Sequence, residues 1–107
     1  MIVRYRLSDP PFAGRTGRGV TIAVLDSGIH AEHPHLEGAT VLAGKSFANE
    51  SDDAIDRIGH GTAVAAAIHE KAPDARLIPV KLFHRHLTTN AEALAQAIDG
   101  RSWRERA

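Results

Sequence analysis

The stretch that decides the fold is VTIAVLDSG, which occupies residues 20–28. Its first six residues are almost all β-branched or apolar, a run typical of a strand buried on both faces of a parallel sheet. A buried helix segment is the alternative that periodicity alone leaves open. The polar turn that follows places Asp26 at the carboxyl end of the strand. Functional groups gather at this end of the strands in open α/β sheets, so Asp26 is a candidate site residue.

Two further stretches are strand candidates. Residues 41–47 form the weaker one, because Gly44 interrupts the run. Residues 76–83, with the sequence RLIPVKLF, form the stronger one. Proline has no N–H to donate to a ladder, so we expect a bend or an unpaired position at Pro79.

Two other stretches favour helices. Residues 62–70 are rich in alanine and contain no helix breaker, and Pro73 follows as the stop. The sequence TNAE at residues 89–92 matches a capping box and predicts a second helix over residues 91–98. Gly100 is a natural end for this helix.

The order of the elements predicts the architecture. Strand, loop and strand, helix, strand, helix indicates an α/β fold with a parallel three-stranded sheet, flanking helices and right-handed crossovers. We divide the chain into an irregular lead-in at residues 1–19, a domain at residues 20–100 and a charged tail at residues 101–107.

Composition excludes several classes of protein. Apolar residues make up 43% of the 107 residues, unlike a disordered segment, and 13 Lys and Arg balance 13 Asp and Glu. This neutral balance gives no electrostatic case for nucleic acid or a membrane as a partner. Without cysteines there is no disulfide or thiol chemistry, and we expect no cofactor. No signal-peptide pattern opens the sequence, so a cytoplasmic location is the default expectation.

Three motifs lie in a recognisable order, and the first of them has two parts. The strand ending in DSGI at residues 26–29 is followed by HPHL at residues 33–36, then by GHGTAVA at residues 59–65 and APDARL at residues 72–77. Together they resemble the aspartate and histidine signatures of the subtilase family of serine proteases. The resemblance covers residues 18–99 and implies an N-terminal portion of the subtilisin-like doubly wound fold. One departure is Ala63, where the family often has histidine.

The resemblance implies roles for two residues. A serine hydroxyl is a poor nucleophile until an imidazole removes its proton, and a carboxylate must hold that imidazole in the correct tautomer. By resemblance Asp26 is the orienting carboxylate and His60 is the general base. Supporting roles fall to four residues beside this pair: Ser27, Gly28, Gly61 and Thr62.

Plainer explanations exist for each motif alone. Asp26-Ser27-Gly28 could be a strand-ending turn, and His60 could be a helix-entry residue without chemistry. By resemblance Ser27 is a structural hydroxyl of the turn and not the nucleophile. Several other histidines lack the spacing of a metal-ligand pair, and we expect no metal site from them: His30, His33, His35, His84 and His86.

A working subtilase also needs a serine in a Gly-Thr-Ser-x-Ala motif and an oxyanion-hole asparagine. Neither Asn49 nor Asn90 stands in a suitable context. The serines of the chain stand outside that motif as well: Ser8, Ser27, Ser46, Ser51 and Ser102. In the family's arrangement a further strand lies beside the strand ending at Asp26, so we expect an open apolar edge at residues 20–25 that invites strand addition.

Three functional hypotheses follow. The first is the N-terminal subunit of a split subtilisin-like serine endopeptidase, in which Asp26 and His60 meet a serine and an asparagine from a partner chain and hydrolyse peptide or protein substrates. The second is an inactive binding or scaffold module, and the third is a truncated fragment without a role. The presence of both Asp26 and His60 favours the first hypothesis, with peptide maturation as a setting suggested by analogy alone. Self-association through the open edge is a further expectation.

Overall fold

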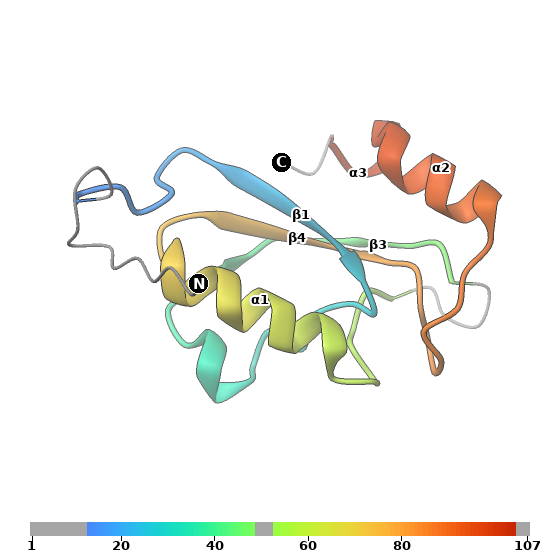
Figure 1. The fold of residues 1–107 in the computed structure, drawn as a ribbon, viewed down its shortest axis with the longest axis horizontal. Helices are drawn as coiled ribbons and strands as arrows, with labels where there is room; N and C mark the ends of the chain where they lie inside the picture. The colour runs from blue at the N-terminus through green and yellow to red at the C-terminus, as the bar shows by residue number, and fades with distance from the viewer. Residues whose placement is uncertain (1–12, 49–52, 105–107) are drawn as a thin grey trace, which may run out of the picture.

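The computed structural model describes residues 13–48 and 53–104, and the expectations for residues 1–12, 49–52 and 105–107 lie outside this part. The chain forms an α/β fold (Figure 1). Its elements in order are β1 (Thr21–Asp26), the 3-10 helix η1 (Pro34–Leu36), β2 (Thr40–Val41), β3 (Lys45–Ser46), α1 (His60–Lys71), β4 (Arg76–Lys81), α2 (Ala91–Asp99) and α3 (Arg101–Arg104).

The sheet is parallel and is built around β4. Strand β1 pairs with one side of β4, and β2 and β3 pair with the other side. The register between β1 and β4 runs from Thr21 opposite Arg76 to Asp26 opposite Lys81. The predicted parallel α/β arrangement is confirmed, but the weaker strand candidate is two short strands, so the sheet has four strands among the described residues.

The interruption between β2 and β3 lies opposite Pro79. The carbonyl oxygens of Leu77 and Lys81 accept hydrogen bonds from the β2–β3 side. Alternate residues of a strand turn their backbone groups to the same side, so the position of the missing N–H of Pro79 faces the gap between the two short strands. Gly44 fills this gap so closely that a Cβ there would collide with the carbonyl oxygen of Pro79. A proline is therefore tolerated in the middle strand because the ladder pauses beside it.

The helices begin and end close to the predicted positions. Helix α1 starts two residues earlier than predicted, after Gly59 in a left-handed conformation (φ = 100°). Helix α2 begins at Ala91, but the expected capping box is wrong by one residue. The N-cap is Asn90, whose side chain accepts a hydrogen bond from the amide of Ala93 at 2.8 Å. The extended backbone of Asn90 brings its short side chain to that amide, and Gly100 ends the helix as predicted.

The two faces of the sheet carry separate cores. Helix α1 packs on one face and α2 on the other, because successive residues of β4 point to opposite sides (Figure 1). The buried residues on the α1 side are Val24, Ile29, Leu36, Ala65 and Leu77. Those on the α2 side are Ile78, Val80, Leu82, Ala93 and Ala97. Within the described ranges, each helix falls short of the length and apolar character needed to cross a membrane.

The short tail helix α3 is fastened to α2. The indole Nε1 of Trp103 donates a hydrogen bond to the carbonyl oxygen of Ala97 at 2.7 Å. The guanidinium of Arg104 lies 5.6 Å from the centre of the Trp103 ring, within the range of a cation–π interaction. Trp103 thereby adds an aromatic side chain to the rim of the α2-side core.

Truncating the centre of the sheet should cost far more than truncating its surface. Ile78 is fully buried between β4 and α2, whereas Ile98 of α2 is 62% exposed. We expect Ile78→Ala to lower the free energy of unfolding by about 2–5 kcal/mol, since it leaves a cavity. The matched change Ile98→Ala should cost less than about 0.5 kcal/mol. Urea unfolding followed by circular dichroism measures both, and equal losses would contradict the packing described for α2.

Candidate active site

Asp26 and His60 meet at the carboxyl edge of the sheet. Asp26 is the last residue of β1 and His60 is the first residue of α1. The imidazole Nδ1 lies 2.9 Å from each carboxylate oxygen of Asp26. The Asp26 side chain is 11% exposed, whereas that of His60 is 53% exposed. A neutral ring that donates from Nδ1 keeps Nε2 as an acceptor, so the free nitrogen can take a proton from an approaching group.

The backbone of β1 holds Asp26 in place. Its Oδ1 accepts a second hydrogen bond from the amide of Ser27 at 2.7 Å. Its carbonyl oxygen accepts hydrogen bonds from the amides of Leu82 and Phe83, just beyond the end of β4. The carboxylate therefore stands on a strand end that is bonded to its neighbour, as a preorganised site requires.

The hydroxyl of Ser27 joins the strand end to the helix start. Ser27 is fully buried, and its Oγ accepts a hydrogen bond from the amide of Gly61 at 2.9 Å. The same Oγ donates to Oδ1 of Asp56 at 2.7 Å. The hydroxyl of Ser27 thus uses its proton and one lone pair in hydrogen bonds within the fold.

Two glycines allow close backbone contacts around the strand end, one with helix α1 and one with the loop at Ala54. A Cβ on Gly61 would collide with the carbonyl oxygen of Gly28 and would lie 3.1 Å from the Oγ of Ser27. Gly28 has a φ of 99°, and a Cβ there would collide with the carbonyl oxygen of Ala54. Glycine at position 61 therefore lets the start of α1 approach the strand end that carries Asp26, and glycine at position 28 leaves room for the loop.

Asp56 is a central residue that our sequence analysis missed. Its Oδ1 accepts hydrogen bonds from the amides of Ile58 (3.0 Å) and Gly59 (2.9 Å) and from the hydroxyl of Ser27. Its Oδ2 accepts from both the amide (2.9 Å) and the hydroxyl (2.6 Å) of Thr62. A signal was present, because an aspartate shortly before a helix start is a candidate cap, although the N-cap position itself is occupied by Gly59.

These hydrogen bonds govern the ionisation of Asp56. Burial disfavours the charged carboxylate and by itself would raise its pKa. The hydrogen bonds from Thr62, Gly59 and Ser27 outweigh burial and lower the pKa from 3.8 to about 2. Asp56 is therefore an ionised acceptor for the start of α1 at neutral pH.

A buried lysine ties the loop of Asp56 to the sheet. Lys81, at the end of β4, is fully buried, and its Nζ donates to the carbonyl oxygen of Ile55 at 2.9 Å. Burial lowers the pKa of Lys81, while Asp53 at 3.7 Å opposes this change. Arg57 binds Asp53 through two hydrogen bonds of 2.8 and 3.1 Å, and this contact lowers the pKa of Asp53. Sequence alone gave no sign of this anchor.

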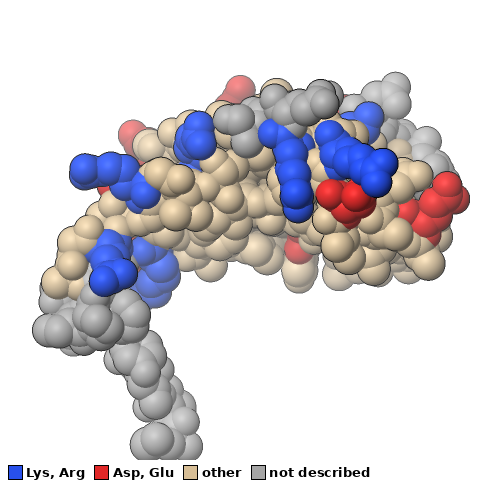
Figure 2. Space-filling model, turned by 90° about the horizontal axis from the view of Figure 1, so that it is seen from above, with Lys and Arg blue, Asp and Glu red and all other residues tan. Residues whose placement is uncertain are grey.

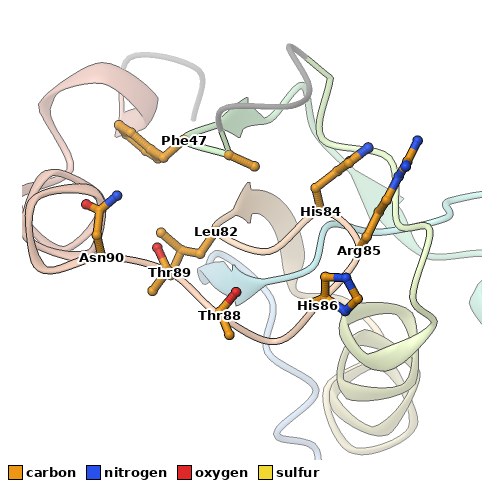
Figure 3. A pocket seen from close by; sticks show the side chains of 9 residues that line it. Phe47, Leu82, His84, Arg85, His86, Thr88, Thr89 and Asn90 are labelled. Carbon is orange, nitrogen blue, oxygen red and sulfur yellow. The ribbon is translucent and has the colours of Figure 1, made fainter.

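Two hollows flank the Asp26–His60 pair. One of about 410 Å³ lies beyond the end of β4 and is lined by residues of the 82–90 segment with Phe47 and Ala48 (Figure 3). The other, of about 430 Å³, lies beside the start of α1 and is lined partly by His30, His33 and His35. The described residues contain no group of three or more histidine and acidic side chains arranged to hold a metal ion.

This chain belongs to the subtilase family, whose sequence profile matches residues 17–102. Serine protease AprX of Bacillus subtilis (strain 168) is 34% identical over 99 residues, which cover 82% of this chain and 21% of AprX. An intracellular serine protease of Paenibacillus polymyxa is 36% identical over 95 residues, covering 77% of this chain and 29% of that protein. A solved structure of a lanthipeptide protease matches with a TM-score of 0.69 and 26% identity, covering 82% of this chain and 27% of that one.

The matched region is a small part of each relative. The chain spans 21% and 29% of the lengths of these two curated relatives. It therefore corresponds to part of a subtilisin-like protease domain.

A methyl group at Gly61 should separate the pair. We expect Gly61→Ala to push the start of α1 away from Gly28 and to break the bond between His60 and Asp26, since both obstructing atoms belong to the strand end. The control Ala63→Ser adds one atom at an exposed position of the same helical turn. A crystal structure of each variant measures the distance from Nδ1 to the carboxylate. An unchanged distance of 2.9 Å in Gly61→Ala would contradict the close approach.

Acid should weaken the fold partly through Asp56. The pKa of Asp56 is lower in the folded state than its ordinary value of 3.8. Its contribution to the free energy of unfolding is therefore fully present above pH 3.8 and is lost as the pH falls through about 2. We expect the urea midpoint of the natural chain to fall more steeply between about pH 4 and pH 2 than that of Asp56→Asn. Urea titrations across this interval measure the difference, and parallel curves would show that Asp56 titrates normally.

Proposed function

We propose that this chain supplies the aspartate and histidine of the Ser-His-Asp triad of a subtilisin-like serine endopeptidase, which hydrolyses peptide bonds. The contact between Asp26 and His60, at 2.9 Å, carries the proposal. The carboxylate of Asp26 is mostly buried, which suits an orienting group, and the ring of His60 is half-exposed, which suits a base that must reach a serine. The named relatives, both serine proteases, support the same reaction class.

In the proposed mechanism His60 acts as the general base. Its Nε2 takes the proton of a serine hydroxyl as the hydroxyl attacks the carbonyl carbon of a peptide bond, and later gives that proton to the leaving amine. Asp26 accepts from Nδ1 throughout and stabilises the imidazolium that forms. The serine and the donor that stabilises the oxyanion come from residues outside the 107 of this sequence.

The serine is proposed to come from a partner polypeptide that adds a strand to β1. Among the described strands β1 pairs with β4 alone. The carbonyl oxygens of Val20 and Asp26 face β4, so the backbone groups of Thr21, Ala23 and Leu25 turn to the free edge. Figure 2 views the molecule from above, and uncharged surface separates the Lys and Arg side chains there. A strand added at this edge would end beside Asp26.

The substrate is proposed to be a peptide that passes the hollow beyond β4. The segment that lines this hollow begins at Leu82, whose amide is bonded to the carbonyl oxygen of Asp26 at 2.7 Å. Figure 3 shows His84 and Arg85 projecting from this segment and His86 lying toward a neighbouring helix. A peptide held here would present its carbonyl group at the same edge of the sheet as His60.

A fluorophosphonate probe tests the proposal, because it labels only an activated serine. The tagged chain is purified from the organism that encodes it and is treated with the probe. We expect the label on a co-purifying polypeptide that carries the serine motif. The variant His60→Ala should retain that polypeptide but reduce labelling by a factor of about 10³ or more, because the serine loses its base.

The other outcomes separate the alternatives. Label on a longer product of the same gene would place the serine in the same polypeptide and overturn the partner arrangement alone. An unlabelled complex of this chain with itself would support pairing between two β1 edges and a scaffold role. Labelling that is equal in His60→Ala would overturn the role of His60.

A further inference from the structure

We infer that Asp56 is a positioning residue that sets the approach of His60 to Asp26, an inference that rests on the proposed catalytic role of this pair. His60 and Asp26 are 34 positions apart in sequence and stand on different elements. Their contact therefore depends on whatever holds the start of α1 against the end of β1. Asp56, on the loop that leads into α1, binds both sides of this junction.

Two hydroxyl groups bridge the junction, and both donate to Asp56. The Oγ of Ser27, on the strand side, accepts from the amide of Gly61 on the helix side at 2.9 Å. The Oγ1 of Thr62, on the helix side, accepts from the amide of His30 on the strand side at 2.9 Å. The two bridges cross the junction in opposite directions. A single carboxylate receives the protons of both hydroxyls, at 2.7 and 2.6 Å.

The shared carboxylate fixes the direction in which each hydroxyl points. A hydroxyl has one proton and two lone pairs and turns freely unless a strong acceptor holds the proton. Because Asp56 holds both protons, lone pairs remain aimed at the amides of Gly61 and His30. Hydrogen bonds to an ionised acceptor are stronger than neutral ones, and the low pKa of Asp56 keeps it ionised.

Asp56 acts on the backbone that carries His60 rather than on the ring. It caps the amide of Thr62, two residues after His60, and the amide of Gly59, one residue before it. The ring itself is bonded to Asp26. Asp56 therefore constrains the residues on both sides of His60 and leaves its Nε2 to the reaction.

Asparagine in place of Asp56 would lose part of this set of hydrogen bonds. The five donors divide into three at Oδ1 and two at Oδ2. An amide side chain keeps one oxygen and replaces the other with an NH₂ group, which only donates. In either orientation backbone amides face the NH₂ group, so Asp56→Asn must release the amide of Thr62 or those of Ile58 and Gly59, and the hydroxyl on that side loses its carboxylate acceptor.

The chain offers a matched control in the same loop. Asp53 is also a carboxylate that accepts from a backbone amide, that of Ile55 at 3.0 Å, and from Arg57. Asp53→Asn therefore removes the same charge from the same loop, together with a contact to Lys81 at 3.7 Å, and leaves the five hydrogen bonds of Asp56 in place.

Nuclear magnetic resonance of the isolated chain tests the inference without the serine half. The downfield proton on Nδ1 of His60 reports its bond to Asp26, and Asp26→Asn provides the reference for its loss. We expect Asp56→Asn to weaken or abolish this signal and to speed hydrogen exchange at the amide of Gly61 or of His30 by about tenfold or more, because the hydroxyl that accepts from that amide loses its ionised acceptor. Asp53→Asn should leave both observables at their natural values.

A wild-type signal in Asp56→Asn, or the same loss in Asp53→Asn, would overturn the inference. If Asp56→Asn does not fold, Thr62→Val decides, since it removes one hydroxyl bridge and leaves Asp56 in place. This variant should speed exchange at the His30 amide and weaken the His60 signal, and unchanged values would overturn the inference. Failure of the fluorophosphonate test alone would remove the proposed reaction but not this geometry.

Discussion

The direct contact between the end of β1 and the start of α1 is the constraint on which the rest of the structure depends. Gly61 lies so close to the carbonyl oxygen of Gly28 that its position has no room for a Cβ. This closeness brings Nδ1 of His60 to 2.9 Å from the carboxylate of Asp26. The surrounding hydrogen bonds serve to keep these two backbones together.

The fold could be predicted to the extent that local sequence determines it. The run that ends at Asp26 is apolar because β1 is covered on both faces, and the alanine-rich stretch after His60 is helical by propensity. The break at Gly44 was also visible in the sequence. Its cause was not, because the pause in the ladder depends on Pro79, which lies in a different strand.

The candidate site also contains residues that the sequence reveals and residues that only the fold reveals. Asp26 and His60 stand in motifs that can be recognised in the sequence, and the structure brings their side chains together. Asp56 offered only the weak signal of an aspartate shortly before a helix start, and neither its bond to Ser27 nor the partner of Lys81 can be read from nearby residues. Lys81 is separated from Ile55 by 26 positions, and Ser27 from Asp56 by 29. A buried lysine gains its meaning only when the fold shows which carbonyl group it meets.

Asp26 and Asp56 show how surroundings separate the tasks of two identical side chains. Asp56 receives five hydrogen bonds from backbone amides and hydroxyl groups of the junction, so both of its oxygens are committed to structure. Asp26 receives one backbone bond and otherwise faces the ring of His60. In the proposed reaction Asp26 responds to a positive charge that develops on the imidazole, and its few other hydrogen bonds leave it free to do so. The saturated carboxylate builds the junction, and the less saturated one is left to act across it.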